Sequence, residues 1–170
     1  MRLASEIASV DALAIPGGES TTMGNLLRAF ALEEPLRRRL AAGLPTLTTC
    51  AGLILLSRSI VDGRADQMAM GTLDIGVRRN GWGSQVDSFE ADVSFRDLGD
   101  IPFRGVFIRA PRIEETGEGV EVLARLGGEP VAVRQGSHIG LTFHPEMTGD
   151  DRVHRLFLEQ AGTVRGETAA

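Results

Sequence analysis

The chain has 170 residues, 42% of them apolar, which is enough to bury one hydrophobic core and fits a single domain. Its net charge of -5 and its lack of a long basic block argue against nucleic acid and membrane surfaces as partners. One cysteine excludes an internal disulfide, and the opening MRLASEIASVDALAI lacks the continuous apolar segment of a signal peptide. We therefore expect a cytoplasmic protein.

The N-terminal part of the chain alternates apolar runs with turn and helix signals. Pro16-Gly17-Gly18 follows an apolar run, and consecutive glycines there let backbone N–H groups face a ligand. The alternative is an ordinary Gly-rich connection. Arg37-Arg38-Arg39 is expected on a solvated helix face. The predicted elements are a strand over 10–15, a loop over 16–20, a helix capped by Ser20 or Thr21 that runs to Phe30, and a helix over 35–42 that Gly43 ends.

The stretch from Leu44 to Ser57 carries the cysteine. Leu44 to Thr49 is apolar and β-branched, which predicts a buried strand. Cys50 follows at a tight turn with Ala51-Gly52, and a helix is expected from there to about Val61. Because a helix N-terminus favours the thiolate, we expect the pKa of the Cys50 thiol to be lowered. The alternative is an inert cysteine buried before a core helix.

The second half of the chain changes to short strands. Gly127-Gly128 and Gly136-Ser137 separate the later ones, which predicts hairpins. Together with the strand–helix alternation of the first half, this predicts an α/β fold with a mixed, mostly parallel sheet flanked by helices. The expected elements are a polar loop over 62–70, strands over 71–78, 86–95, 104–108, 120–126, 130–134 and 139–143, a helix over 150–161 and a disordered tail over 163–170.

One of the three histidines has the setting of a catalytic base. His144 ends the apolar run 139–143 and is followed by Pro145-Glu146, whereas His138 and His154 are expected at the surface. A neutral imidazole at a strand end deprotonates a nearby thiol, and a carboxylate two residues on holds its other nitrogen. The alternative is a strand-end histidine beside a solvent-facing glutamate.

Six segments in this order, PGGES, TCAGLILLS, RRNGWGSQVDSFEADV, FRGVFIRAP, VAVRQG and FHPEMT, resemble the glutaminase subunit of pyridoxal 5′-phosphate synthase. That family is a class I, triad-type glutamine amidotransferase. The similarity runs from about Val10 to Leu158. Cys50 with His-x-Glu is typical of the superfamily, and QVDSFEADV and FIRAP are typical of this family. The resemblance implies one flavodoxin-like amidotransferase domain over residues 1–162.

The resemblance also implies an activity. The chain is expected to hydrolyse L-glutamine to L-glutamate and ammonia without a cofactor or metal, and to pass the ammonia to a (β/α)8-barrel synthase subunit in vitamin B6 biosynthesis. By motif, Cys50 is the nucleophile, His144 the general base and acid, and Glu146 its orienting partner. The other implied residues are the substrate-binding set Gly18, Glu19, Ser20, Arg79, Ile108 and Arg109 and the oxyanion-binding backbone of Gly18 and Ala51.

Arg109 has a physical argument of its own. A cation that ends an apolar strand needs an anion, which is either the substrate α-carboxylate or one of the carboxylates of Glu114 and Glu115.

Two features depart from the family pattern. Family members begin with a further strand and helix, on the order of 30 residues, ahead of the segment that matches Ser9 to Ile15. Without that unit we expect an exposed strand edge, exposed apolar helix surface, marginal stability and weaker docking to the synthase. Thr48 stands where the family has glycine, which predicts reduced activity. The alternative functions are a weakened or inactive homologue that only binds its partner, and another class I glutaminase or γ-glutamyl hydrolase.

Overall fold

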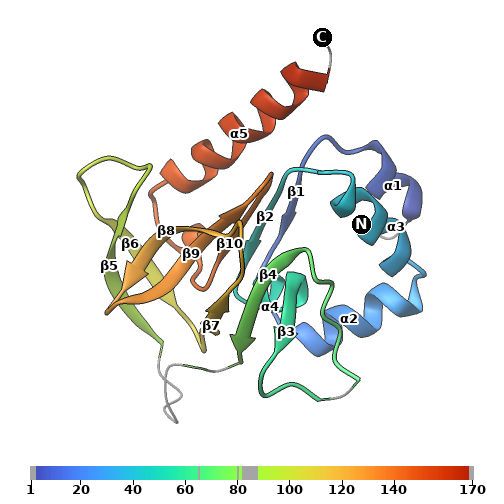
Figure 1. The fold of residues 1–170 in the computed structure, drawn as a ribbon, viewed down its shortest axis with the longest axis horizontal. Coiled ribbons are helices and arrows are strands. Elements are labelled where there is room, and N and C mark those ends of the chain that lie inside the picture. The colour runs from blue at the N-terminus through green and yellow to red at the C-terminus, as the bar shows by residue number, and fades with distance from the viewer. Residues whose placement is uncertain (1–2, 65, 80, 82–87, 169–170) are drawn as a thin grey trace.

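The computed structural model describes residues 3–64, 66–79, 81 and 88–168, with side chains described as far as residue 162. Figure 1 shows a curled sheet with helices on both sides. The helices are α1 (Ala4–Ser9), α2 (Ser20–Ala29), α3 (Glu33–Ala41), α4 (Ala51–Leu56), the 3₁₀ turn η1 (Pro145–Met147) and α5 (Arg152–Thr168). The strands are β1 (Leu13–Ile15), β2 (Thr46–Thr49), β3 (Ser57–Ile60), β4 (Leu73–Arg78), β5 (Phe89–Phe95), β6 (Phe103–Phe107), β7 (Arg112–Thr116), β8 (Glu121–Leu126), β9 (Glu129–Gln135) and β10 (His138–Leu141).

The strands form two sheets, one of seven strands in the order β1-β2-β10-β9-β8-β5-β6 and one of three in the order β3-β4-β7. Parallel pairs join β1 to β2, β2 to β10 and β3 to β4, and the other pairs among the described strands are antiparallel. The predicted α/β class and the hairpins at Gly127-Gly128 and Gly136-Ser137 are confirmed. The sequence predicted a mostly parallel sheet, but most of the strand pairs are antiparallel.

Several element boundaries differ from the prediction. The helix after Cys50 ends at Leu56 rather than near Val61, because Ser57 begins a strand that pairs with β4. The helix α1 and the strand β7 were not predicted. The sequence of β7, RIEET, has no apolar run that would indicate a strand, and three of its five residues are exposed. The strand expected over 86–95 is β5 from Phe89, and residues 86 and 87 lie outside the described part. Helix α5 extends to Thr168, beyond the predicted end at Ala161. Disorder over 163–170 stays a prediction.

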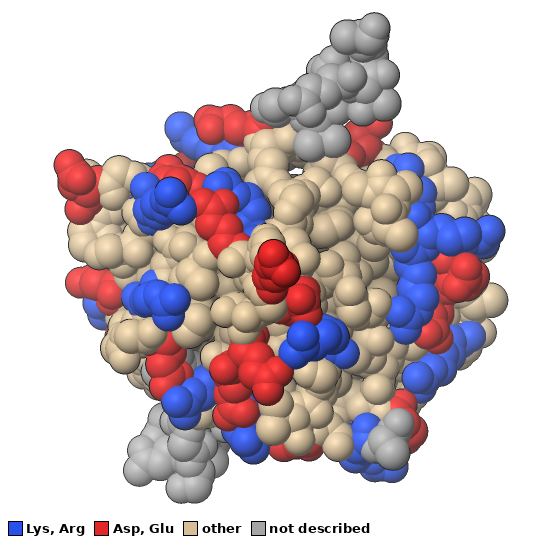
Figure 2. Space-filling model, in the orientation of Figure 1, with Lys and Arg blue, Asp and Glu red and all other residues tan. Residues whose placement is uncertain are grey.

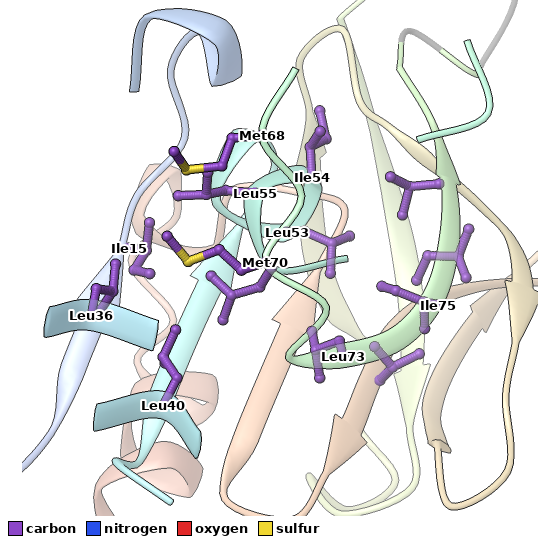
Figure 3. Packing of buried hydrophobic residues seen from close by; sticks show 14 of the residues in the cluster. Ile15, Leu36, Leu40, Leu53, Ile54, Leu55, Met68, Met70, Leu73 and Ile75 are labelled. Atoms are coloured by element: carbon purple, nitrogen blue, oxygen red, sulfur yellow. The ribbon is translucent and has the colours of Figure 1, made fainter. Parts of the chain in front are cut away.

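Two hydrophobic clusters stabilise the fold. The first, in Figure 3, packs α4 against α3, β1 and β4, with Met68 and Met70 filling the space between them. All six residues of α4 are buried, so this short helix is held by tertiary packing and not by its own length. The second cluster packs α5 on the other part of the sheet through Val153 and Phe157 and contains Phe103, Phe107 and Phe143.

Two arginines of α3 bind backbone rather than solvent, which corrects the expectation of a solvated face for them. Arg37 donates to the carbonyl oxygens of Met70 at 2.8 Å and Ala69 at 3.2 Å. Arg39 donates to Val10 O at 2.6 Å and Ile7 O at 3.3 Å. Arg38 pairs only with Glu34 among the described contacts and is exposed, as predicted. On the face in Figure 2, basic and acidic side chains are interspersed.

An apolar groove lies beside the edge strand β1. Its volume is about 630 Å³. It is lined by Ile7, Leu13, Ala14, Ile15, Pro16, Met23, Leu26, Leu27, Phe30, Leu32, Leu36 and Leu55. Leu26 and Phe30 on this side of α2 are about half exposed. The expected exposed strand edge and apolar helix surface are therefore present here.

Candidate active site

Cys50 sits on a strained turn between the buried strand β2 and helix α4. Its backbone has φ +48° and ψ -104°, a conformation that non-glycine residues rarely adopt. The Cys50 N–H donates to Leu141 O of β10 at 2.9 Å, and Ile54 N–H donates back to Cys50 O at 3.2 Å. The turn is therefore fixed on both sides by backbone hydrogen bonds, and the cysteine is held where strand and helix meet.

Gly52 makes this turn possible. A Cβ atom at Gly52 would collide with the Ile15 carbonyl oxygen and would lie 3.0 Å from Ile15 Cγ2. Only glycine lets α4 approach β1 this closely. Thr48, two residues before Cys50, is fully buried, and its hydroxyl donates to Ile139 O at 3.4 Å. The structure thus accommodates Thr48 within the sheet, and its effect on activity stays a prediction.

The thiol environment differs from the expectation of a lowered pKa. Cys50 is 7% exposed, and burial raises the pKa of its thiol. The Ala51 backbone N–H and the positive charge of Arg109 act in the opposite direction but are smaller effects, and Glu146 adds to the rise. The expectation of a lowered pKa rested on the helix N-terminus alone, whereas desolvation of the buried thiol is the larger effect. The thiol therefore needs a base to ionise it.

His144 and Glu146 supply that base and its partner. His144 follows β10, and its backbone N–H donates to Val106 O of β6 at 2.9 Å. Its Nδ1 lies 2.7 Å from Glu146 Oε1, and η1 places this carboxylate in its first turn. A carboxylate accepts only, so Nδ1 carries the proton and the neutral ring has Nε2 free to accept one. Gly17 packs against this ring so closely that a Cβ atom there would collide with it.

Of the other two histidines, His138 is buried rather than at the surface, because it begins β10 in the middle of the sheet. Burial lowers the pKa of its imidazole. His154 on α5 is half-buried.

The PGGES loop ends in a helix cap. Glu19, not Ser20 or Thr21, caps α2: its carboxylate accepts from Thr21 N at 3.0 Å, Thr22 N at 2.6 Å and Thr22 Oγ1 at 2.7 Å. These hydrogen bonds lower the pKa of Glu19 to about 2. Gly18 has φ +153°, which favours glycine over other residues.

Two arginines enter the site from different strands. Arg79 follows β4; its backbone N–H donates to Asp62 Oδ1 at 2.8 Å, and its guanidinium lies 3.7 Å from Glu19 Oε1. Arg109 follows β6 with φ +42°. Among the described residues no ion pair holds Arg109. Glu114 pairs with Arg78, and Glu115 pairs with Arg58. This leaves the guanidinium of Arg109 available for an anionic ligand.

One cavity of about 340 Å³ brings these groups together. Its lining is Gly18, Glu19, Ser20, Cys50, Ala51, Ile54, Arg79, Ile108, Arg109 and His144. Every predicted site residue is in this lining except Glu146, which reaches it through His144. The Cys50 thiol lies 3.8 Å from Ile108 O. The sequence did not predict Ile54 as a site residue, because it lies in an apolar run that is typical of a buried helix. Nor did it predict Gln67, which forms hydrogen bonds with both Ser20 and Arg79.

The arrangement suits covalent catalysis on an amide. It combines a thiol, a base with an oriented tautomer, backbone N–H groups at a strand–helix turn and two cations. Within the described part of the chain, no cluster of three metal-binding side chains occurs. Nor does any helix in that part have the length and apolar character to cross a membrane.

Comparisons with known proteins agree with this geometry. The model of the SNO glutamine amidotransferase family matches residues 1–163. A protein from Frankia alni named pyridoxal 5′-phosphate synthase subunit PdxT is 56% identical over 94% of this chain and 80% of its own length. The protein of the same name from Mycolicibacterium vanbaalenii is 58% identical over 93% and 82%. A crystal structure described as a glutamine amidotransferase superposes with a TM-score of 0.89 at 49% identity, over 95% of this chain and 85% of that one.

Proposed function

Because the chain belongs to the SNO glutamine amidotransferase family, we propose that it is the glutaminase subunit of a pyridoxal 5′-phosphate synthase. It hydrolyses L-glutamine to L-glutamate and ammonia, and the ammonia serves vitamin B6 biosynthesis. The observation that carries this proposal is the single cavity that holds Cys50, the His144–Glu146 pair and two arginines. Relatives that are more than half identical to this chain over the aligned residues bear the synthase-subunit name.

The first half of the reaction forms a thioester. Neutral His144 takes the proton from the buried Cys50 thiol, and the thiolate attacks the side-chain amide carbon of glutamine. The backbone N–H groups of Gly18 and Ala51 bind the resulting oxyanion. Imidazolium at His144 then donates its proton to the leaving nitrogen, so ammonia departs and a γ-glutamyl thioester remains on Cys50.

The second half regenerates the enzyme. His144, again neutral, deprotonates a water molecule that attacks the thioester carbon, and the returning proton restores the Cys50 thiol. Glu146 keeps the proton of neutral His144 on Nδ1 and stabilises the imidazolium in both halves. The guanidinium groups of Arg79 and Arg109 bind the α-carboxylate of the substrate, which fixes the amide relative to the thiol.

The partner of this subunit is a synthase subunit that consumes the ammonia, and we assign it a (β/α)8-barrel fold. Free ammonia is lost to protonation in water, so the glutaminase is expected to work docked to that subunit. The cytoplasm is the proposed compartment, because it keeps the free thiol of Cys50 reduced.

The test is glutamate release from L-glutamine, with and without an added synthase subunit, for the wild-type chain and Cys50→Ala. Release that depends on Cys50 and rises with the partner supports the proposal. If a folded wild-type sample releases no glutamate in either condition but still binds the synthase subunit, the chain acts only as a binding partner. If release occurs at full rate and the partner neither binds nor changes it, another glutaminase or γ-glutamyl hydrolase is the better assignment.

A further inference from the structure

Gln67 contacts two residues of the cavity lining without being part of that lining. Its Nε2 donates to Ser20 Oγ at 2.9 Å, and its Oε1 accepts from Arg79 Nη1 at 3.0 Å. Gln67 belongs to the loop between β3 and β4, Ser20 begins α2, and Arg79 follows β4. One amide therefore links two walls of the cavity that come from different parts of the chain.

The chemistry of the three groups fixes the direction of these hydrogen bonds. A guanidinium only donates, so the amide oxygen of Gln67 faces Arg79 and its NH₂ group faces Ser20. The Ser20 hydroxyl then uses its oxygen as the acceptor and keeps its own hydrogen to donate. Because Ser20 is 3% exposed and lines the cavity, a ligand there is the acceptor within reach.

The neutral amide also preserves the charge of Arg79. The carboxylate of Glu19 lies 3.7 Å from the guanidinium of Arg79 and already accepts from Thr21 and Thr22. Gln67 holds the guanidinium in place without neutralising it. A carboxylate at position 67 would instead pair with Arg79 and compete with an anionic ligand.

We propose that Gln67 is a positioning residue for L-glutamine: it aligns the Arg79 guanidinium and the Ser20 hydroxyl on the α-carboxylate of the substrate. This inference rests on the glutamine hydrolysis proposed above and adds a residue to it. Gln67 acts on substrate binding and not on the thiol chemistry, since its contacts are with Ser20 and Arg79 rather than with Cys50 or His144.

The kinetic test measures KM and kcat for glutamine in the assembled complex. Gln67→Ala should raise KM roughly tenfold, the effect of one hydrogen bond to a charged group, and should leave kcat within about twofold. Gln67→Glu should raise KM at least as much, because it neutralises Arg79. Arg64→Ala is the matched control on the same loop, where the exposed guanidinium pairs with Asp66, and it should leave KM unchanged.

A second measurement does not depend on turnover. A chloroketone analogue of L-glutamine carries the α-carboxylate and alkylates a thiol, whereas iodoacetamide alkylates the same thiol without an α-amino-acid group. Gln67→Ala should slow alkylation of Cys50 by the chloroketone roughly tenfold and leave the iodoacetamide rate unchanged. Thermal midpoints of all the variants show whether each one is folded.

Two results would overturn the proposal. One is an unchanged KM together with an unchanged chloroketone rate. The other is equal slowing of both alkylating reagents with a fall in kcat, which a general loosening of the loop would cause. If the wild-type complex releases no glutamate, the proposed function fails, and the alkylation comparison still decides the role of Gln67.

Discussion

Two hollows of this protein differ in their lining, and the smaller one holds the reactive groups. The groove beside the strand edge is about 630 Å³ and is lined by apolar side chains from α1, α2 and α3. The cavity at the carboxyl ends of β1 and β2 is about 340 Å³ and is lined by a thiol, an imidazole, two guanidinium groups and a carboxylate. The groove is the larger of the two and its lining is apolar, whereas the cavity is smaller and polar groups converge on it. In this protein the chemistry of the lining is the better guide to function.

The largest effect should come from the nucleophile in the cavity. Cys50→Ser keeps the size of the side chain but replaces a thiol with a far weaker acid. Glutamate release should fall roughly 10⁵-fold or more. The measurement is glutamate release in the presence of the synthase subunit, and binding of that subunit is the control for folding. If Cys50→Ser retained more than about 10⁻² of the wild-type rate, a covalent role for Cys50 would be contradicted.

The next largest effect should come from the partner of the base. In Glu146→Gln the amide NH₂ can donate to His144 Nδ1, which moves the ring proton to Nε2 and removes the acceptor for the Cys50 proton. We expect kcat to fall roughly 10³-fold. Glu146→Asp, which stays an acceptor, is the comparison and should retain more activity than the glutamine variant. Equal loss of kcat in both variants would mean that the distance between residue 146 and His144, and not the tautomer of His144, determines the rate.

A backbone contact in the same wall should have an intermediate effect. In Gly17→Ala the new methyl group would collide with the His144 ring and displace it, so kcat should fall roughly 10²-fold. Gly149→Ala is the matched control, because a Cβ atom there meets nothing within 4 Å. Both variants should be assayed for glutamate release and for thermal midpoint. Full activity in Gly17→Ala would show that the ring position tolerates movement.

The electrostatic environment of the thiol predicts a smaller change. Thiolate is the species that iodoacetamide alkylates, and burial raises the pKa of Cys50, so the midpoint of the alkylation rate should lie at a higher pH than that of a free cysteine. Arg109→Gln removes a charge that lowers this pKa and should move the midpoint to still higher pH. Glu146→Gln should move it the other way. A wild-type midpoint below that of a free cysteine would restore the lowered pKa that the helix N-terminus alone predicts.

The smallest effect should come from the groove. Phe30 lies at the C-terminal end of α2, is 53% exposed, and lines the apolar groove but not the polar cavity. Phe30→Ser should therefore leave kcat/KM for glutamine within about twofold of the wild-type value. A tenfold loss, roughly the effect expected for a cavity residue, would show that the two hollows are coupled through α2.

Local signals pointed to the nucleophile, the base and the PGGES loop, and the family resemblance supplied the set of substrate-binding residues. Cys50, the PGGES loop and the His144–Glu146 pair each combine a short apolar strand with an abrupt turn, and parallel strands bring such turns to one edge of a sheet. The hairpin between β8 and β9 was also predicted from a local signal. Its turn requires positive φ at Gly127 and Gly128, which glycine adopts readily.

What the sequence did not reveal depends on long-range contacts. Helix α4 ends at Leu56 because the following residues pair with β4, and no local signal marks that point. The raised pKa of Cys50 comes from burial, which neighbours in the sequence do not determine. Gln67 reaches Ser20 across 47 positions, and in the sequence it is one polar residue in a polar loop. Glu19 lines the cavity, as the resemblance implies, and also caps α2, for which the sequence predicted Ser20 or Thr21.

The pairing of β2 with β10 ties the catalytic groups to two interior strands of the sheet. Thr49 is in register with Leu141, and the amide of the next residue, Cys50, donates to Leu141 O at 2.9 Å. Exchange of that amide hydrogen with solvent therefore requires the neighbouring strands β2 and β10 to part. The nucleophile follows one of these strands, and the base follows the other after two residues. Fluctuations that open loops elsewhere but leave this strand pair closed therefore keep the backbone positions of the nucleophile and the base together.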